Sequence, residues 1–96
     1  MTGDGGWALF DRALAGSLSS KGISVVGWDS RQYYASQRSP DEAAQDLHRI
    51  IVHYRSIWKK DRVALIGYSF GADVLPFLIN RLDSADFRSV DCIAFL

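Results

Sequence analysis

One serine in this chain stands in a setting that suits nucleophilic catalysis. Residues Gly67–Gly71 read Gly-Tyr-Ser-Phe-Gly, directly behind the apolar run Val63–Ile66 and ahead of a helical pattern. A sharp strand-to-helix turn of this kind, called a nucleophile elbow, exposes the serine hydroxyl. Gly67 and Gly71 suit the turn because a β-carbon would obstruct its backbone and the close approach of strand and helix. Ser69 is therefore a candidate nucleophile, and the alternative is a serine that merely caps the helix.

Ester hydrolysis by a serine also needs backbone donors for the oxyanion that forms. One donor should be the amide of Phe70, because the residue after the nucleophile supplies it in an elbow. The second should come from Asp4 and Gly5 in the glycine-rich turn Gly3–Gly6, whose amides can point at an anion near a positive helix end. The alternative for this turn is a flexible N-terminal tail.

The sequence offers no base and no acid to complete a catalytic triad. On hydrolase scaffolds with this elbow, the acid and then the histidine follow the serine along the chain. His48 and His53 both precede Ser69, and a spacing of five residues turns them away from each other on a helix. We expect two surface histidines and no metal site, since a helical metal pair needs a spacing of four. No cofactor is indicated either, and we expect the chain to hydrolyse activated esters poorly or not at all.

Apolar spacing predicts three helices around this turn. The first begins at Trp7 and ends before Gly22, which suits a C-terminal cap. The second runs from the capping box at Ser39 to Trp58. The third runs from Phe70 to Leu82 and is bent rather than ended by Pro76.

Short β-branched runs predict three strands, over Ile23–Trp28, Arg62–Gly67 and Val90–Leu96. A polar and aromatic loop at Ser30–Arg38 separates the first strand from the helix after it. Because helices and strands alternate, we predict the α/β class, with a parallel sheet covered by helices on both faces. The 96 residues suffice for one domain with a marginal core.

Three residues near the end of the first predicted strand form a candidate substrate pocket. Asp29, Arg31 and Tyr33 follow Trp28 at the carboxyl edge, where open α/β sheets bind ligands. The alternative is that Asp29 caps the loop and the tyrosines cover the edge of the core.

Composition excludes some partners and compartmental signals. The 11 basic and 11 acidic residues are interspersed, so no basic surface for nucleic acid is indicated. The N-terminus lacks the pattern of a signal peptide, and no stretch is apolar enough to span a membrane. Cys92, the single cysteine, lies in an apolar run and is expected in the core.

Four blocks together resemble the bacterial virulence protein family VirJ/AcvB, within the α/β-hydrolase superfamily. They are Gly3–Trp7, Val25–Ser30, Ser39–Ala44 and Leu65–Phe77, and they extend over nearly the whole chain. The resemblance implies a partial α/β-hydrolase fold with Ser69 as nucleophile and the glycine-rich turn as oxyanion loop. It also implies a periplasmic protein that acts on aminoacyl ester lipids such as lysyl- or alanyl-phosphatidylglycerol, with a connection to type IV secretion proteins.

The chain lacks several strands that the domains of this family contain. Family domains have strands before the glycine turn and after the position of Leu96, and those later strands carry the acid and the histidine. We therefore expect residues 1–96 to be the central portion of such a domain. Two classes of function remain open, an ester hydrolase and a binding module for a secretion component or lipid that performs no chemistry.

The absent central strand has a consequence for assembly. In the resembled fold it lies between the strands at Ile23–Trp28 and Arg62–Gly67. Without it, these two strands either pair directly or leave unpaired edges that recruit another chain. We expect self-association rather than a stable monomer.

Overall fold

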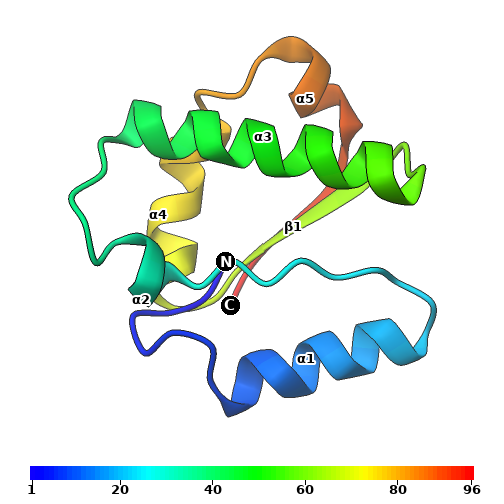
Figure 1. Cartoon of the computed structure of the whole chain (residues 1–96), viewed down its shortest axis with the longest axis horizontal. Helices are drawn as coiled ribbons and strands as arrows, with labels where there is room; N and C mark the ends of the chain where they lie inside the picture. Colours follow the sequence, from blue (N-terminus) through cyan, green and yellow to red (C-terminus); the bar gives the residue numbers. More distant parts are fainter.

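The computed structural model describes residues 1–96 as five helices and two strands (Figure 1). In chain order they are α1 (Leu9–Ser20), α2 (Ser30–Tyr33), α3 (Pro40–Trp58), β1 (Val63–Gly67), α4 (Phe70–Ile79), α5 (Ser84–Ser89) and β2 (Val90–Phe95). The two strands are parallel neighbours, with Val63 opposite Val90 and Gly67 opposite Phe95. Helices combined with a parallel sheet agree with the predicted α/β class.

The core lies where α3 and α4 meet β1. Its buried apolar residues are Ala43, Leu47 and Ile51 from α3, Leu65 from β1, and Leu75, Leu78 and Ile79 from α4. In Figure 1 the strands run between α3 on one side and α1 on the other. Only 17 of the 96 residues are buried, so the core is as small as the length predicts. None of the helices has the length and apolar character needed to cross a membrane.

Helix α3 forms as its sequence predicts. The Ser39 hydroxyl accepts a hydrogen bond from the Glu42 N–H at 3.1 Å, which satisfies a donor that the first helical turn leaves free. Pro40 stands at the first helical position, and Lys59 ends the helix in a left-handed conformation with φ 52°. This helix leads through four residues into the amino end of β1.

The predicted strand at Ile23–Trp28 is wrong. The segment runs extended beside the sheet in Figure 1 but pairs with no strand. Its backbone hydrogen bonds occur only at its two ends, from the Ile23 N–H to Leu18 and from the Thr2 N–H to the Trp28 carbonyl. A β-branched run favours extended backbone, but a strand also needs a neighbour at hydrogen-bonding distance. The Ile23–Trp28 segment and β1 do not pair with each other, and a gap separates them.

Several element boundaries also differ from the prediction. Helix α1 begins at Leu9 instead of Trp7, and α4 ends at Ile79 instead of Leu82. Helix α2 lies inside the predicted loop, and α5 was not predicted at all. Both have a local cause, because Asp29 and Asp83 each cap the helix that follows with a carboxylate oxygen.

Cys92 is exposed, which corrects its expected place in the core. It belongs to β2, an edge strand of which only Val90 and Ala94 are half-buried. An apolar run in an edge strand can stay open to solvent when no helix covers that face.

Candidate active site

Ser69 lies on the turn between the last residue of β1 and the first residue of α4. Its φ of 53° and ψ of −114° place a residue with a β-carbon in a strained conformation, as the elbow geometry requires. Its N–H donates to the Leu96 carbonyl at 2.8 Å, which anchors the turn beside the end of β2. The side chain is exposed and forms no capping hydrogen bond, so the simple helix-cap alternative does not describe it.

The two elbow glycines are required by close backbone contacts. A Cβ on Gly67 would stand 2.7 Å from the Gly71 carbonyl oxygen and 2.9 Å from the Ala72 Cα. A Cβ on Gly71 would stand 2.6 Å from the Thr2 carbonyl oxygen. Any side chain at either position would therefore push backbone apart at the turn.

The glycine turn at Gly3–Gly6 lies directly against Ser69. A Cβ on Gly3 would stand 3.3 Å from the Ser69 Cβ, and the turn itself closes with a hydrogen bond from the Gly6 N–H to the Gly3 carbonyl at 3.1 Å. Gly3 and Gly6 are buried, whereas Asp4 and Gly5 at the tip are exposed. The turn is thus part of the fold and not a loose tail.

A buried pair of hydroxyl residues fixes the start of this turn. The Ser30 N–H donates to the Thr2 hydroxyl at 2.8 Å, and the Ser30 hydroxyl donates to the Thr2 carbonyl at 2.6 Å. Each residue is only 1% exposed. The pair could not be predicted from the sequence, because nothing local to either residue signals a contact across 28 positions.

Three backbone amides, two in the glycine turn and one directly after Ser69, are free donors. The N–H groups of Asp4, Gly5 and Phe70 donate to no backbone or side-chain acceptor. Oxyanion stabilisation needs donors of this kind that are held in place and not already used. Their role in catalysis remains a prediction.

Asp29 holds the glycine turn and α2 together. One carboxylate oxygen accepts from the Gln32 N–H at 3.0 Å and the other from the Trp7 N–H at 3.2 Å. Gly6 has a φ of 78°, and a Cβ there would lie 3.0 Å from the Asp29 carboxylate. The structure therefore gives Asp29 the capping role that was the alternative to a pocket residue.

Arg31 and Tyr33 differ in their availability to a substrate. Arg31 is exposed and forms no ion pair. It lies beside the glycine turn, because a Cβ added to Gly6 would stand 3.3 Å from the Arg31 Cβ. The Tyr33 hydroxyl donates to Asp46, and its ring packs edge-on against Trp28 with a centroid separation of 4.9 Å. Burial and the Asp46 hydrogen bond raise the pKa of Tyr33. Tyr33 therefore covers the core edge, and Arg31 is the free polar group.

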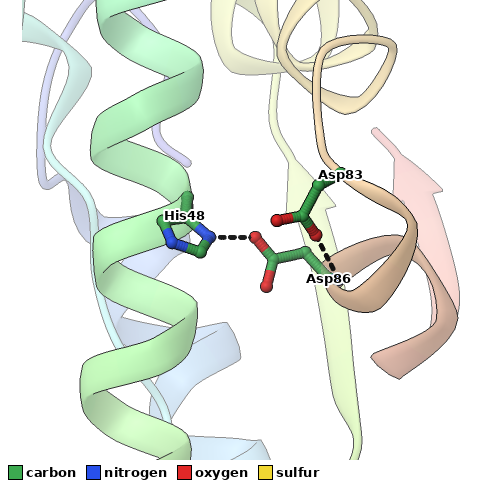
Figure 2. A group of neighbouring side chains, drawn as sticks. All are labelled: His48, Asp83 and Asp86. Carbon is green, nitrogen blue, oxygen red and sulfur yellow. Dashed lines mark hydrogen bonds and ion pairs between the residues drawn. The ribbon is translucent and has the colours of Figure 1, made fainter.

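His48 has a carboxylate partner that no local sequence signal indicates (Figure 2). Its Nδ1 contacts the Asp86 carboxylate, and this hydrogen bond raises the pKa of the imidazole. Helix α5 leads directly into the amino end of β2, whereas Ser69 follows the carboxyl end of β1. Because the strands are parallel, the pair of His48 and Asp86 lies at the amino end of the sheet, whereas Ser69 lies at the carboxyl end. His48 therefore cannot act as the base for Ser69.

The same cluster includes Asp83. The side-chain nitrogen and oxygen atoms of His48, Asp83 and Asp86 that could bind a metal ion lie within 4.8 Å of one another. Each residue, however, already takes part in a contact that holds the fold. An Asp83 oxygen accepts from the Asp86 N–H at 2.8 Å as the cap of α5, and Asp86 is paired with His48. His53, the other histidine, is exposed and packs edge-on against Tyr54 at a centroid distance of 4.9 Å.

Comparison with known proteins identifies a family. A family model described as bacterial virulence protein (VirJ) matches residues 1–96, the whole chain. No curated protein and no solved structure matches.

Proposed function

This chain belongs to the VirJ family of bacterial virulence proteins, and on that premise we propose that it carries the nucleophile of a serine hydrolase acting on aminoacyl-phosphatidylglycerol. The observation that supports this proposal most is the exposure, backbone conformation and surroundings of Ser69. It is exposed, strained at φ 53°, and adjacent to a glycine turn with free amides. We propose on the same basis that the fold is a partial α/β-hydrolase fold.

The proposed reaction is an acyl transfer from the lipid to Ser69. The Ser69 oxygen attacks the aminoacyl carbonyl carbon, and the bond from that carbon to the glycerol oxygen breaks. The serine proton passes through a base to the leaving glycerol oxygen, and water then releases the amino acid from the serine. The amides of Phe70, Asp4 and Gly5 would stabilise the oxyanion, since no other acceptor uses them.

Arg31 gives this proposal a site for the lipid headgroup. It is exposed, unpaired and adjacent to the glycine turn. A guanidinium binds phosphate through two parallel hydrogen bonds, so Arg31 would hold the lipid phosphodiester while Ser69 reacts with the ester. Action in the periplasm and contact with type IV secretion proteins complete the proposal and rest on the family resemblance.

A binding module is the second candidate function. One observation favours it, namely that His48 is paired with Asp86 at the end of the sheet opposite to Ser69, while His53 packs against Tyr54. In that case the same turn and Arg31 would bind a lipid or a secretion component without chemistry.

Vesicles that contain lysyl-phosphatidylglycerol distinguish the two candidates. Free imidazole is added as an external base, and released lysine is measured with the chain and with its Ser69→Ala variant. We expect release that depends on Ser69 and on imidazole. Equal release from both proteins would overturn the hydrolase proposal. Vesicle cosedimentation that is unchanged by Ser69→Ala but lost in Arg31→Ala, without any release, would favour the binding module.

A further inference from the structure

Two stacked aromatic rings lie beside Ser69. A Cβ on Gly3 would stand 3.7 Å from the ring of Tyr68, and the same position lies 3.3 Å from the Ser69 Cβ. The Phe10 ring, from α1, stacks on Tyr68 with a centroid separation of 4.3 Å and an angle of 21° between the ring planes. Phe10 is 42% exposed and Tyr68 is half-buried, so this aromatic pair is open to solvent next to the candidate nucleophile.

The glycine turn adds a free carboxylate to the same place. Asp4 follows Gly3 in the turn, is exposed and forms no ion pair. Asp29, the other carboxylate against the turn, is already occupied by two backbone N–H groups. A carboxylate without a partner attracts a cation, and the faces of aromatic rings attract cations as well. Asp4 and the aromatic pair therefore favour the same kind of ligand group.

Arg31 supplies the opposite charge at the other end of the turn. It lies against Gly6 and forms no ion pair with Asp4 or with any other residue. A free anion and a free cation on one turn suit a ligand that carries both charges. In aminoacyl-phosphatidylglycerol, the ammonium is attached to the carbon next to the ester carbonyl, and the phosphate lies beyond the glycerol. The turn has the same order of charges, because Asp4 follows the residue that lies against Ser69.

We propose that Asp4 and the aromatic pair of Phe10 and Tyr68 bind the ammonium group of the aminoacyl ester and select it over uncharged acyl esters. This inference rests on the proposed function and names the residues that recognise its substrate. The carboxylate attracts the charge, and the ring faces replace part of the water that the cation loses. The Asp4 side chain has this role, while its backbone N–H stays available to the oxyanion. An ester without the ammonium makes neither contact, so the site discriminates by charge.

Binding of a soluble headgroup tests this proposal. The probe is alanyl-glycerophosphoglycerol, which carries one ammonium and one phosphodiester, and the control is the same molecule with its nitrogen acetylated. Both are titrated by calorimetry into Ser69→Ala, which cannot form an acyl-enzyme, at about pH 6, where the ammonium is protonated and carboxylates are ionised. We expect the probe to bind about tenfold more tightly than the acetylated control. Equal affinities, or binding of neither molecule, would overturn the proposal.

A second substitution in the Ser69→Ala chain tests the role of Asp4. Asp4→Asn should weaken binding of the probe about three- to fivefold and leave binding of the acetylated control unchanged. Asp61→Asn is the matched variant, because Asp61 is exposed, forms no ion pair and precedes the amino end of β1. It makes the same change in net charge away from the turn and should bind the probe normally. Equal weakening by the two substitutions, or none by Asp4→Asn, would contradict the assignment.

The aromatic pair is tested in the same way. Phe10→Leu keeps an apolar side chain but removes the ring, so we expect binding of the probe to weaken about two- to fivefold. Phe77→Leu is the matched variant, because Phe77 is 58% exposed on α4, and it should bind the probe normally. Thermal unfolding checks that both variants fold. If both bound the probe with the same affinity, the aromatic pair would have no part in recognition.

These measurements separate ammonium recognition from the proposed hydrolysis. If Ser69→Ala prefers the probe but the parent chain releases no alanine from it in the presence of imidazole, the hydrolase proposal fails and ammonium recognition stands. Release that depends on Ser69, combined with equal binding of the probe and its acetylated control, would have the opposite consequence.

Discussion

Gly3 lies so close to Ser69 that a Cβ on the glycine would stand 3.3 Å from the serine Cβ. The two residues come from opposite parts of the chain, and separate anchors hold them together. Ser69 is fixed by its bond to Leu96, and Gly3 by the buried pair of Thr2 and Ser30. The candidate site is therefore a product of tertiary packing around the elbow.

The elbow should not tolerate a side chain at Gly67. Gly67→Ala places a Cβ 2.7 Å from the Gly71 carbonyl oxygen, and this neighbour is backbone that cannot rotate away. We expect a loss of about 1–3 kcal/mol in the free energy of unfolding, measured by urea denaturation. Gly16→Ala is the matched control, because nothing lies within 4 Å of that position in α1, and it should gain up to about 1 kcal/mol. Equal effects of the two substitutions would contradict the packing account.

Asp29 should act on Ser69 through the glycine turn. Asp29→Ala removes the cap of α2 and the acceptor for the Trp7 N–H, so we expect a loss of about 1 kcal/mol in unfolding free energy. It should also slow the reaction of Ser69 with a fluorophosphonate. Asp29→Asn keeps one acceptor oxygen, which can cap α2, but its NH2 group cannot accept from the Trp7 N–H, so this variant should retain most of the stability and still react slowly. If Asp29→Ala reacted at the parental rate, Asp29 would have no positioning role.

The pair of His48 and Asp86 should make stability depend on pH. The Asp86 hydrogen bond raises the pKa of His48 above its ordinary value of 6.5, although the imidazole side chain is 47% exposed. Folding therefore favours the protonated imidazole. The stabilisation is fully present below about pH 6.5 and is lost as the pH rises through the raised pKa of the folded state. The melting temperature of the parent relative to His48→Gln should be higher at about pH 5.5 than at about pH 8.5.

His53→Gln provides the control for this comparison, because His53 has no carboxylate partner in the structure. It should melt with the parental pH dependence. If the melting temperature of the parent exceeded that of His48→Gln by more at high pH than at low pH, the predicted direction of the pH dependence would be wrong.

The outer edge of β2 should promote self-association. The strand pairs with β1 on one side only, and Ile93 and Phe95 are 38% and 50% exposed. Unpaired apolar edges recruit other strands, and a lysine on such an edge prevents this. Sedimentation velocity over a concentration range should show association of the parent and a shift toward monomer in Ile93→Lys. A parent that stays monomeric at every concentration would refute the expectation.

Local sequence signals predicted the parts of the fold that depend on neighbouring residues. Helix α3 has its cap at Ser39 and an apolar face that includes Leu47 and Ile51, both buried. The turn at Ser69 lies where its flanking glycines indicate. Each of these features is determined within a few residues of the chain, which is why periodicity and capping rules identify them.

The parts that sequence could not predict depend on distant partners. Ile23–Trp28 has the composition of a strand, but it borders an apolar groove and has no strand beside it to pair with. The contacts of Thr2 with Ser30 and of His48 with Asp86 join residues 28 and 38 positions apart. No local pattern encodes such pairs, so the prediction that His48 is a surface residue agrees with its exposure but did not include its carboxylate partner.

Selective modification of Ser69 tests the central claim most directly. The chain is treated with a fluorophosphonate in the presence and absence of imidazole, and each serine is quantified by peptide mass spectrometry. With imidazole, the account predicts that Ser69 reacts about 100-fold faster than Ser56, an exposed serine on α3 with no oxyanion donors. Without imidazole, ester turnover should stay close to that of Ser69→Ala. Equal modification of Ser69 and Ser56 under both conditions would show that the elbow does not activate its serine.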